Sequence, residues 1–239
     1  MKKTDYHIAY VFPNLLTAAS CFFGILSVVA SFEGEFEKAI IFIFISLVLD
    51  GLDGRVARLT NTTSKFGVEF DSLCDLVAFG VAPAMLFYCA MGHEFGRPGI
   101  LASGIFVVFG AIRLARFNVT TMQNEPNIFI GLPIPMAAIS VVSWVALYIK
   151  FDFHLNLGYV YTICIICIGL LMVSNIRYPS FKQIDLNKTN FRKVLVLAIL
   201  LLALLYIKPI EFMATVTTSY MFYGVIRVVL KFYLAKIKK

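Results

Sequence analysis

The chain has 239 residues, of which 60% are hydrophobic and only 15% charged, and its mean hydropathy is +0.85. Soluble domains are closer to half apolar and a quarter charged, so this composition excludes an ordinary soluble fold. The net charge of +7 is not accompanied by basic runs interleaved with aromatic residues, so nucleic acid is not an expected partner.

Apolar runs long enough to span a membrane recur along the whole chain. A helix needs roughly 20 apolar residues to cross the hydrocarbon core of a bilayer. We therefore expect eight transmembrane helices, at residues 12–32, 38–59, 66–92, 98–117, 133–150, 157–176, 191–207 and 211–232. The links between them are short. The pattern predicts an all-α polytopic membrane protein that forms a single domain over residues 1–239.

The distribution of lysine and arginine predicts the orientation of these helices. If the N-terminus is placed in the cytoplasm, every lysine and arginine lies on the inner side except Lys38, Arg97, Lys150 and Lys208. Cytoplasmic segments carry such an excess of positive charge in membrane proteins, and it also attracts anionic lipid headgroups. We expect a multi-pass protein of the cell membrane with both termini in the cytoplasm.

Four aspartates interrupt the second and third expected helices. At about 100° per residue, Asp50 and Asp53 share one face of the second helix, and Asp71 and Asp75 share one face of the third. A short loop joins the two helices, so the two pairs can face each other near the cytoplasmic side. Charged side chains within a membrane are costly and by default indicate a functional site.

Four converging carboxylates in a low dielectric repel one another unless cations neutralise them. An all-oxygen ligand set favours Mg²⁺, Mn²⁺ or Ca²⁺ over zinc. Small residues are interleaved with the aspartates, which favours a slot for a ligand, although small residues also allow close helix packing in membranes. These residues are Gly51, Gly54, Ala57 and Gly67.

The pattern D-x-x-D-G-x-x-A-R-x(8)-G-x-x-x-D-x-x-x-D is complete between Asp50 and Asp75. It resembles the signature of the CDP-alcohol phosphotransferase family. The resemblance implies that the four aspartates hold a two-metal centre of Mg²⁺ or Mn²⁺ and that Asp75 is also the general base. It implies further that Arg58 contacts the diphosphate, while Gly54, Ala57 and Gly67 make room for the cytidine.

Four further stretches resemble the phosphatidylserine synthase branch of this family. They are FPNLLT at 12–17, RLARFN at 113–118, GLPIP at 131–135 and SNIRYPS at 174–180. The resemblance covers roughly the first 180 residues and implies transfer of a phosphatidyl group from CDP-diacylglycerol to L-serine, in a homodimer with a lateral opening for the lipid. The last two expected helices, at 191–232, are peripheral to the motif and carry no pattern that we can interpret.

Polar residues near the cytoplasmic ends of other helices are candidates for substrate binding. Arg113 and Arg116 lie one turn apart, and a guanidinium suits either the serine carboxylate or the donor phosphate. Both arginines are equally typical of positive-inside anchors. Asn118 can add hydrogen bonds there. Asn14 and Thr17 are candidates for the nucleotide site, or for capping and packing.

Three alternatives remain open at this stage. The acceptor could be glycerol 3-phosphate or inositol phosphate, which are more anionic and need more basic residues in the pocket. The donor could be an ether-linked isoprenoid CDP-lipid. A cation transporter is a third possibility, but the sequence contains no inverted repeat and the aspartates cluster at one place instead of lining a path.

Overall fold

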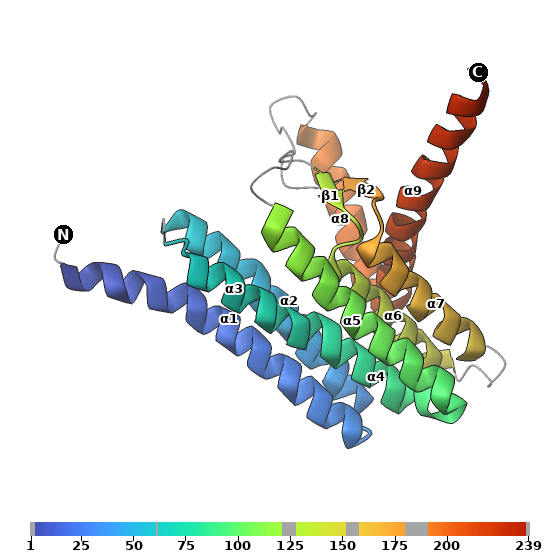
Figure 1. Cartoon of the computed structure of the whole chain (residues 1–239), viewed down its shortest axis with the longest axis horizontal. Helices are drawn as coiled ribbons and strands as arrows, with labels where there is room; N and C mark the ends of the chain where they lie inside the picture. The colour runs from blue at the N-terminus through green and yellow to red at the C-terminus, as the bar shows by residue number, and fades with distance from the viewer. Residues whose placement is uncertain (1–2, 61, 121–127, 152–157, 180–190, 238–239) are drawn as a thin grey trace.

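The computed structural model describes residues 3–60, 62–120, 128–151, 158–179 and 191–237, most of which are helical (Figure 1). The α-helices are α1 (Lys3–Phe32), α2 (Phe36–Leu59), α3 (Lys65–Asp75), α4 (Ala82–Ala90), α5 (Arg97–Thr120), α6 (Ile134–Phe151), α7 (Gly158–Val173), α8 (Phe191–Ile207) and α9 (Pro209–Ile237). Short segments complete the described fold: π-helical η1 (Leu76–Val81), 3₁₀-helical η2 (Gly92–Phe95), and the strands β1 (Ile128–Ile130) and β2 (Arg177–Pro179).

Each of the eight expected spans coincides with a helical segment, and the third is the continuous run α3–η1–α4. Within the described ranges, five stretches are long and apolar enough to cross a bilayer: Val11–Phe32, Lys65–Ala90, Arg97–Val119, Ile134–Phe151 and Pro209–Leu230. The protein is therefore a helical membrane protein. The remaining three helices carry the charges of the signature (α2) or are shorter, with 16 residues in α7 and 17 in α8, so the count of eight spans stays a prediction.

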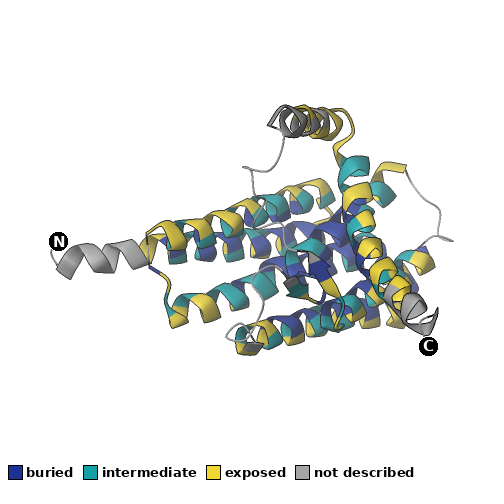
Figure 2. Ribbon diagram, turned by 90° about the horizontal axis from the view of Figure 1, so that it is seen from above, coloured by how far each residue is buried: buried dark blue, intermediate teal, exposed yellow. Residues whose placement is uncertain are grey.

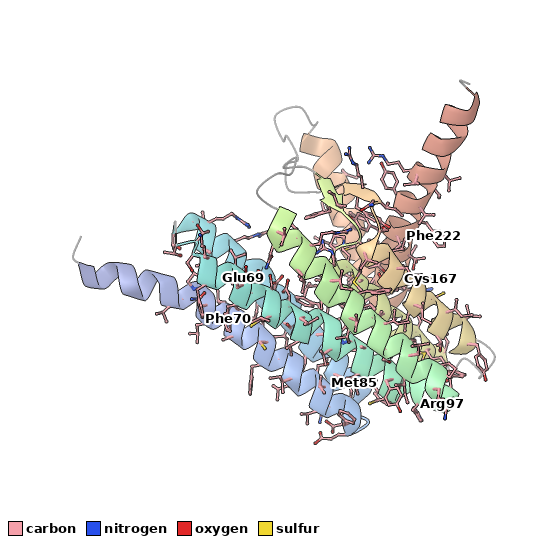
Figure 3. The ribbon with its side chains drawn as sticks, in the orientation of Figure 1. Glu69, Phe70, Met85, Arg97, Cys167 and Phe222 are labelled. Carbon is pink, nitrogen blue, oxygen red and sulfur yellow. The ribbon has the colours of Figure 1, made fainter. Side chains whose placement is uncertain are left out.

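The helices form a bundle whose outer surface is apolar. α1 packs along α2 and also touches α3, η1 and α4, while α5 packs on α7 and α6 lies between α4 and α9. The buried residues face the middle of the bundle in Figure 2, and the side chains turned outward include many leucines, isoleucines and valines. An apolar exterior is what a bilayer requires. Figure 3 shows Glu69 and Arg97 towards opposite ends of the bundle.

Small and hydroxyl-bearing residues join the N-terminal helices. The Ser20 and Ser46 hydroxyls are 2.7 Å apart, and Ser27 donates a hydrogen bond of 2.9 Å to the Ala39 carbonyl, both between α1 and α2. A Cβ on Gly24 would lie only 2.8 Å from the Ala78 Cα of η1, so this close approach requires glycine. Such contacts associate helices in lipid, where the hydrophobic effect between helices is weak.

The helix widens into η1 directly after Asp75, where the sequence predicts an uninterrupted span. Pro83, in the first turn of α4, lacks an amide hydrogen, and its ring conflicts with the carbonyl four residues earlier in a regular α-helix. A π-type turn relieves this conflict, and such turns occur often at functional sites. The irregularity therefore separates the segment that carries Asp71 and Asp75 from the buried helix α4.

A two-stranded antiparallel sheet closes the end of the bundle near α5 and α9. β1 pairs with β2 so that Phe129 lies opposite Tyr178 and Ile130 opposite Arg177. Gly131 follows β1 with a φ of +78°, a conformation that favours glycine, and its amide donates to the Ile176 carbonyl. The sheet thus places the start of α6 beside the C-terminal end of α7.

Candidate active site

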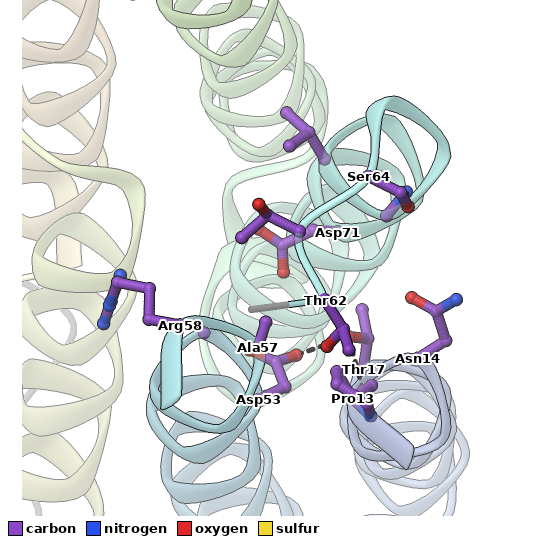
Figure 4. A pocket seen from close by; sticks show the side chains of 13 residues that line it. Pro13, Asn14, Thr17, Asp53, Ala57, Arg58, Thr62, Ser64 and Asp71 are labelled. Atoms are coloured by element: carbon purple, nitrogen blue, oxygen red, sulfur yellow. Dashed lines mark hydrogen bonds between the residues drawn. The ribbon is translucent and has the colours of Figure 1, made fainter. Parts of the chain in front are cut away.

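Three of the four predicted aspartates meet between α2 and α3. One carboxylate oxygen each from Asp50, Asp53 and Asp71 lies within 4.8 Å of the other two. Asp53 is buried, with 4% of its surface exposed, whereas Asp50 and Asp71 are partly exposed. Figure 4 shows Asp53 and Asp71 reaching into the same space from the two helices. The periodicity that the sequence showed in each helix therefore does produce one carboxylate cluster.

Asp75 joins this cluster from one turn further along α3. Its carboxyl group interacts with that of Asp50 across the α2–α3 pair. Asp75 is the last residue of α3 and η1 begins at the next residue. The structure thus brings three aspartates of the signature within reach of one ion, and Asp75 lies next to Asp50, one turn beyond Asp71.

Thr17 on α1 holds the innermost aspartate. Thr17 is 5% exposed; its hydroxyl donates to Asp53 Oδ2 over 2.5 Å, and the Pro13 carbonyl lies 3.1 Å from the same hydroxyl. A hydrogen bond to a ligating carboxylate fixes its orientation and supports metal affinity. Thr17 therefore positions Asp53 in addition to lining the neighbouring cavity.

The donor set of this cluster suits divalent cations. It consists of carboxylate oxygens alone, which hard divalent ions prefer, and the oxygens are close enough for one ion to contact several of them. Converging carboxylates in a membrane also need positive charge to be stable together. The residues present therefore fit a divalent metal centre.

A cavity of about 200 Å³ lies beside the aspartates, between α1, α2 and α3 (Figure 4). Its walls include all six residues that the sequence assigned to the nucleotide donor: Asn14, Thr17, Gly54, Ala57, Arg58 and Gly67. Asp53 and Asp71 form its inner wall. The cavity therefore joins the predicted nucleotide slot to the predicted metal centre.

The two glycines of the slot differ in how tightly they are enclosed. A Cβ on Gly67 would lie 3.2 Å from Ser64 Oγ and 3.3 Å from Asn14 Oδ1. A Cβ on Gly54 would meet only the Arg58 guanidinium, at 3.8 Å and beyond. Gly67 thus permits close packing at the rim, while a larger residue at Gly54 would project into the cavity.

The polar link between α2 and α3 forms a part of the cavity wall that we did not predict from the sequence. Thr62, Thr63 and Ser64 all line the cavity. Ser64 is the N-cap of α3, and its hydroxyl accepts a hydrogen bond of 3.0 Å from the Gly67 amide. Serine is one of the residues preferred at the N-cap, so Ser64, directly before the start of the third expected helix, could have identified this edge of the site.

Arg113, the first of the two candidate arginines, is buried between α5 and the start of α6. It is 6% exposed, its Nε donates to the Leu132 carbonyl over 2.6 Å, and its guanidinium carbon lies 5.9 Å from the centre of the Phe117 ring. It also interacts electrostatically with Asp75. Arg113 therefore places a buried positive charge between α5 and the start of α6, within electrostatic range of Asp75.

The guanidinium of Arg116 contacts the end of α7 and the strand β1. Its guanidinium donates to the carbonyls of Met172, Val173 and Ser174 at the end of α7, and to that of Ile130. The last carbonyls of a helix have no partners within the helix, so a guanidinium there satisfies them and also opposes the helix dipole. This arginine connects α5 to α7 and to the sheet.

Asn118 bridges α5 and α3. Its Nδ2 donates to Glu69 Oε2 and to Ser72 Oγ, each over 3.0 Å. Ser72 directly follows Asp71 in the sequence. The amide of Asn118 therefore supports the helix that carries two of the aspartates, a supporting function that also involves Glu69 and Ser72.

Comparisons with known proteins agree with this geometry. Residues 10–167 match the family model described as CDP-alcohol phosphatidyltransferase. A Helicobacter pylori protein named CDP-diacylglycerol–serine O-phosphatidyltransferase is 49% identical over 219 residues, covering 91% of each chain. A Bacillus subtilis protein of the same name is 34% identical over 176 residues, covering 72% of this chain and 91% of the relative. The archaetidylserine synthase of Methanothermobacter thermautotrophicus is 38% identical over 180 residues, covering 74% and 72%.

Proposed function

The chain belongs to the CDP-alcohol phosphatidyltransferase family, and on that premise we propose that it transfers the phosphatidyl group of CDP-diacylglycerol to L-serine, forming phosphatidylserine and CMP. The observation that carries this proposal is the complete signature from Asp50 to Asp75, whose carboxylates converge beside the cavity. The names of the relatives support serine as the acceptor.

The cavity between α1, α2 and α3 takes the CDP part of the donor. Gly54, Ala57 and Gly67 leave room for the cytidine, and Arg58 on the rim provides a cation for the diphosphate. Asn14 and Thr17 complete the wall on α1. The lipid chains then extend sideways into the bilayer, since the outer surfaces of the helices are apolar.

Asp50, Asp53, Asp71 and Asp75 would hold a pair of divalent cations, Mg²⁺ or Mn²⁺, with Ca²⁺ as a possible occupant of the same oxygen ligands. When bound, such a pair neutralises the charge of the diphosphate and stabilises the departing CMP. The protein itself mainly has to position the reactants, because phosphoryl-type transfer requires little covalent help.

In the proposed reaction the serine hydroxyl attacks the phosphorus that carries the lipid. Asp75 accepts the hydroxyl proton, a new P–O bond forms to serine, and the P–O bond to the cytidine monophosphate breaks, so that CMP leaves with the bond's electron pair. Arg113, whose charge acts on Asp75, binds the serine carboxylate. A guanidinium suits a carboxylate because it offers several donors in one plane.

The proposed orientation places this site and both termini on the cytoplasmic side of the cell membrane, where serine is available. The distribution of lysine and arginine along the chain supports this orientation. A homodimer is the assembly we propose from the family resemblance, with membrane lipids around it.

The test is release of CMP by purified protein supplied with CDP-diacylglycerol and Mg²⁺ or Mn²⁺. Serine, glycerol 3-phosphate and inositol phosphate are added one at a time. We expect release that depends on serine and stops with EDTA. Release with one of the other alcohols but not with serine would overturn the choice of acceptor, and release unaffected by EDTA would overturn the metal centre.

A variant pair tests the role of Asp75. Asp75→Asn should abolish turnover while the protein remains folded and binds CDP-lipid. Glu37→Gln, at the other end of α2 in an exposed position, is the matched loss of a carboxylate and should keep full activity. Substantial turnover by Asp75→Asn would contradict the base assignment.

The archaetidylserine synthase relative favours one second candidate, in which the donor is an ether-linked isoprenoid CDP-lipid. The site's polar residues contact the headgroup and would serve either donor. Turnover with the ether donor at a kcat/KM well above that for CDP-diacylglycerol would establish this alternative.

A further inference from the structure

An open groove of about 740 Å³ lies between α6, α7 and α9 and shares no residue with the cavity beside the aspartates. It follows α9 from Glu211 to Ile226, and Phe222, labelled in Figure 3, belongs to this wall. The helix rises about 22 Å over this stretch, at about 1.5 Å per residue. The family match ends at residue 167, so the α9 wall lies outside the residues that match the family model.

The groove runs into the membrane from its boundary. α6 and α9 each contain a stretch long and apolar enough to cross a bilayer, Ile134–Phe151 and Pro209–Leu230. Lys150 stands at the end of the first stretch and Glu211 at the start of the second, so both lie at the level of lipid headgroups. Half of the hydrocarbon core is about 15 Å thick. The groove is therefore long enough to hold one chain of a lipid whose headgroup lies beside these two residues.

One carboxylate oxygen at this end of the groove has no partner within the described part of the chain. Lys150 Nζ lies 2.8 Å from Glu211 Oε1, whereas Glu211 Oε2 is buried and accepts no hydrogen bond from the described residues. A buried acceptor without a donor costs free energy. The Glu211 side chain is 27% exposed and its terminal torsion is soft, so a rotation presents Oε2 to a donor in the groove.

Aromatic side chains form much of the lining. The Trp144 and Tyr161 rings lie 6.3 Å apart with their planes at 62°, and Trp144 Nε1 donates to Thr218 Oγ1 over 3.0 Å, which fixes the indole between α6 and α9. Tyr223 adds an exposed ring from α9. Aromatic faces attract cations within about 6 Å. The lining therefore suits an apolar ligand that has a cationic end.

We propose that this groove binds one phospholipid with a phosphoethanolamine headgroup. The ammonium donates to Glu211 Oε2, the phosphate accepts a hydrogen bond from Lys150, and one acyl chain follows α9 towards Ile226. The Lys150–Glu211 pair carries one charge of each sign, which is complementary to a zwitterionic headgroup. The lipid would complete the hydrogen bonding of Glu211 and fill the groove that the packed helices leave open.

The chemistry of the headgroup distinguishes this lipid from the others. A choline headgroup carries methyl groups in place of N–H donors and cannot donate to Glu211 Oε2. A serine headgroup adds a second carboxylate, which Glu211 repels. A glycerol headgroup has no cation. The groove should therefore select the ethanolamine lipid.

The experiment measures the lipid that the purified full-length protein retains in native mass spectrometry. Phosphatidylethanolamine, phosphatidylcholine and phosphatidylglycerol with identical chains are supplied at equal concentrations. We expect one phosphatidylethanolamine per chain, retained about tenfold more than phosphatidylcholine, because only the ethanolamine lipid makes a charged hydrogen bond. It should also raise the melting temperature in detergent by about 4 °C more than phosphatidylcholine does. Neither readout depends on catalysis.

Variants assign the preference to the groove. Glu211→Gln should bring the retention of phosphatidylethanolamine close to that of phosphatidylcholine. Glu35→Gln is the matched control, because Glu35 also pairs with a lysine, Lys38 at 2.7 Å, but on the exposed link between α1 and α2. This variant should keep the preference. Ser219→Trp, at an exposed position of the groove, should fill the space and abolish retention while the protein stays folded.

Equal retention of phosphatidylethanolamine and phosphatidylcholine by the wild-type protein overturns the proposal. An unchanged preference in Glu211→Gln also overturns it, because the lipid would then bind elsewhere. A second copy of the chain could cover the groove instead of a lipid. In that case Ser219→Trp would change the oligomeric mass measured by light scattering and leave lipid retention as it was, which again overturns the proposal.

Discussion

Thr17→Val tests whether the hydroxyl on α1 sets the metal affinity of the aspartate cluster. Valine keeps the shape of the buried threonine but removes the donor that lies 2.5 Å from Asp53 Oδ2. A hydrogen bond to a charged group contributes about 1.5–3 kcal/mol, and each 1.4 kcal/mol corresponds to about tenfold in an equilibrium constant. The metal concentration that gives half-maximal activity should therefore rise roughly 10- to 100-fold.

The assay is CMP release titrated with Mg²⁺ or Mn²⁺ at saturating serine and CDP-diacylglycerol. At saturating metal the variant should recover most of its turnover, because Thr17 orients a ligand and does not react. Thr162→Val is the matched control, since Thr162 is equally buried but its hydroxyl donates to the Gly158 carbonyl within α7. Superimposable metal titrations for Thr17→Val and the wild type would refute the reasoning.

Three further predictions follow from the contacts around the site. Gly67→Ala should raise the KM for CDP-diacylglycerol roughly tenfold, because the added Cβ crowds Ser64 and Asn14. Gly51→Ala is the control and should match the wild type in the same kinetic assay, because no atom lies within 4 Å of its added Cβ. Arg116→Ala should lower the melting temperature in detergent by about 5 °C, because the last carbonyls of α7 lose their donor. The KM for serine of the folded variant should stay unchanged, and a selective rise in that KM would show that Arg116 binds the acceptor. Asn118→Ala should lower kcat about tenfold with little change in either KM, because the hydrogen bonds from α5 to α3 are lost. A rise in the serine KM alone, measured by steady-state kinetics, would contradict this positioning role.

Local periodicity was enough to predict the helices and the convergence of the aspartates. The rise and rotation per residue of a helix are constant, so Asp50 and Asp53 had to share one face and Asp71 and Asp75 another. The short link between α2 and α3 then brought the two faces together. The nucleotide slot was predictable for the same reason, since its small residues belong to the same two helices.

The tertiary structure decided how residues distant in the sequence are used. The sequence could not distinguish Arg113 from Arg116, one turn apart, because their partners come from segments elsewhere in the chain: the start of α6 for one and the end of α7 for the other. The bond between Thr17 and Asp53 and the bond between Asn118 and Glu69 likewise join separate helices.

The membrane environment of the helices explains why their formation was predictable from the sequence and their packing was not. In a membrane each helix satisfies its own backbone hydrogen bonds, so its formation depends on local sequence alone. The packing of one helix on another depends instead on small residues and on a few hydrogen bonds between helices, such as those at Gly24 and Ser20. The sequence therefore determined which segments are helical and which faces carry the aspartates, whereas only the packed bundle decided which threonine holds Asp53 and where each arginine is directed.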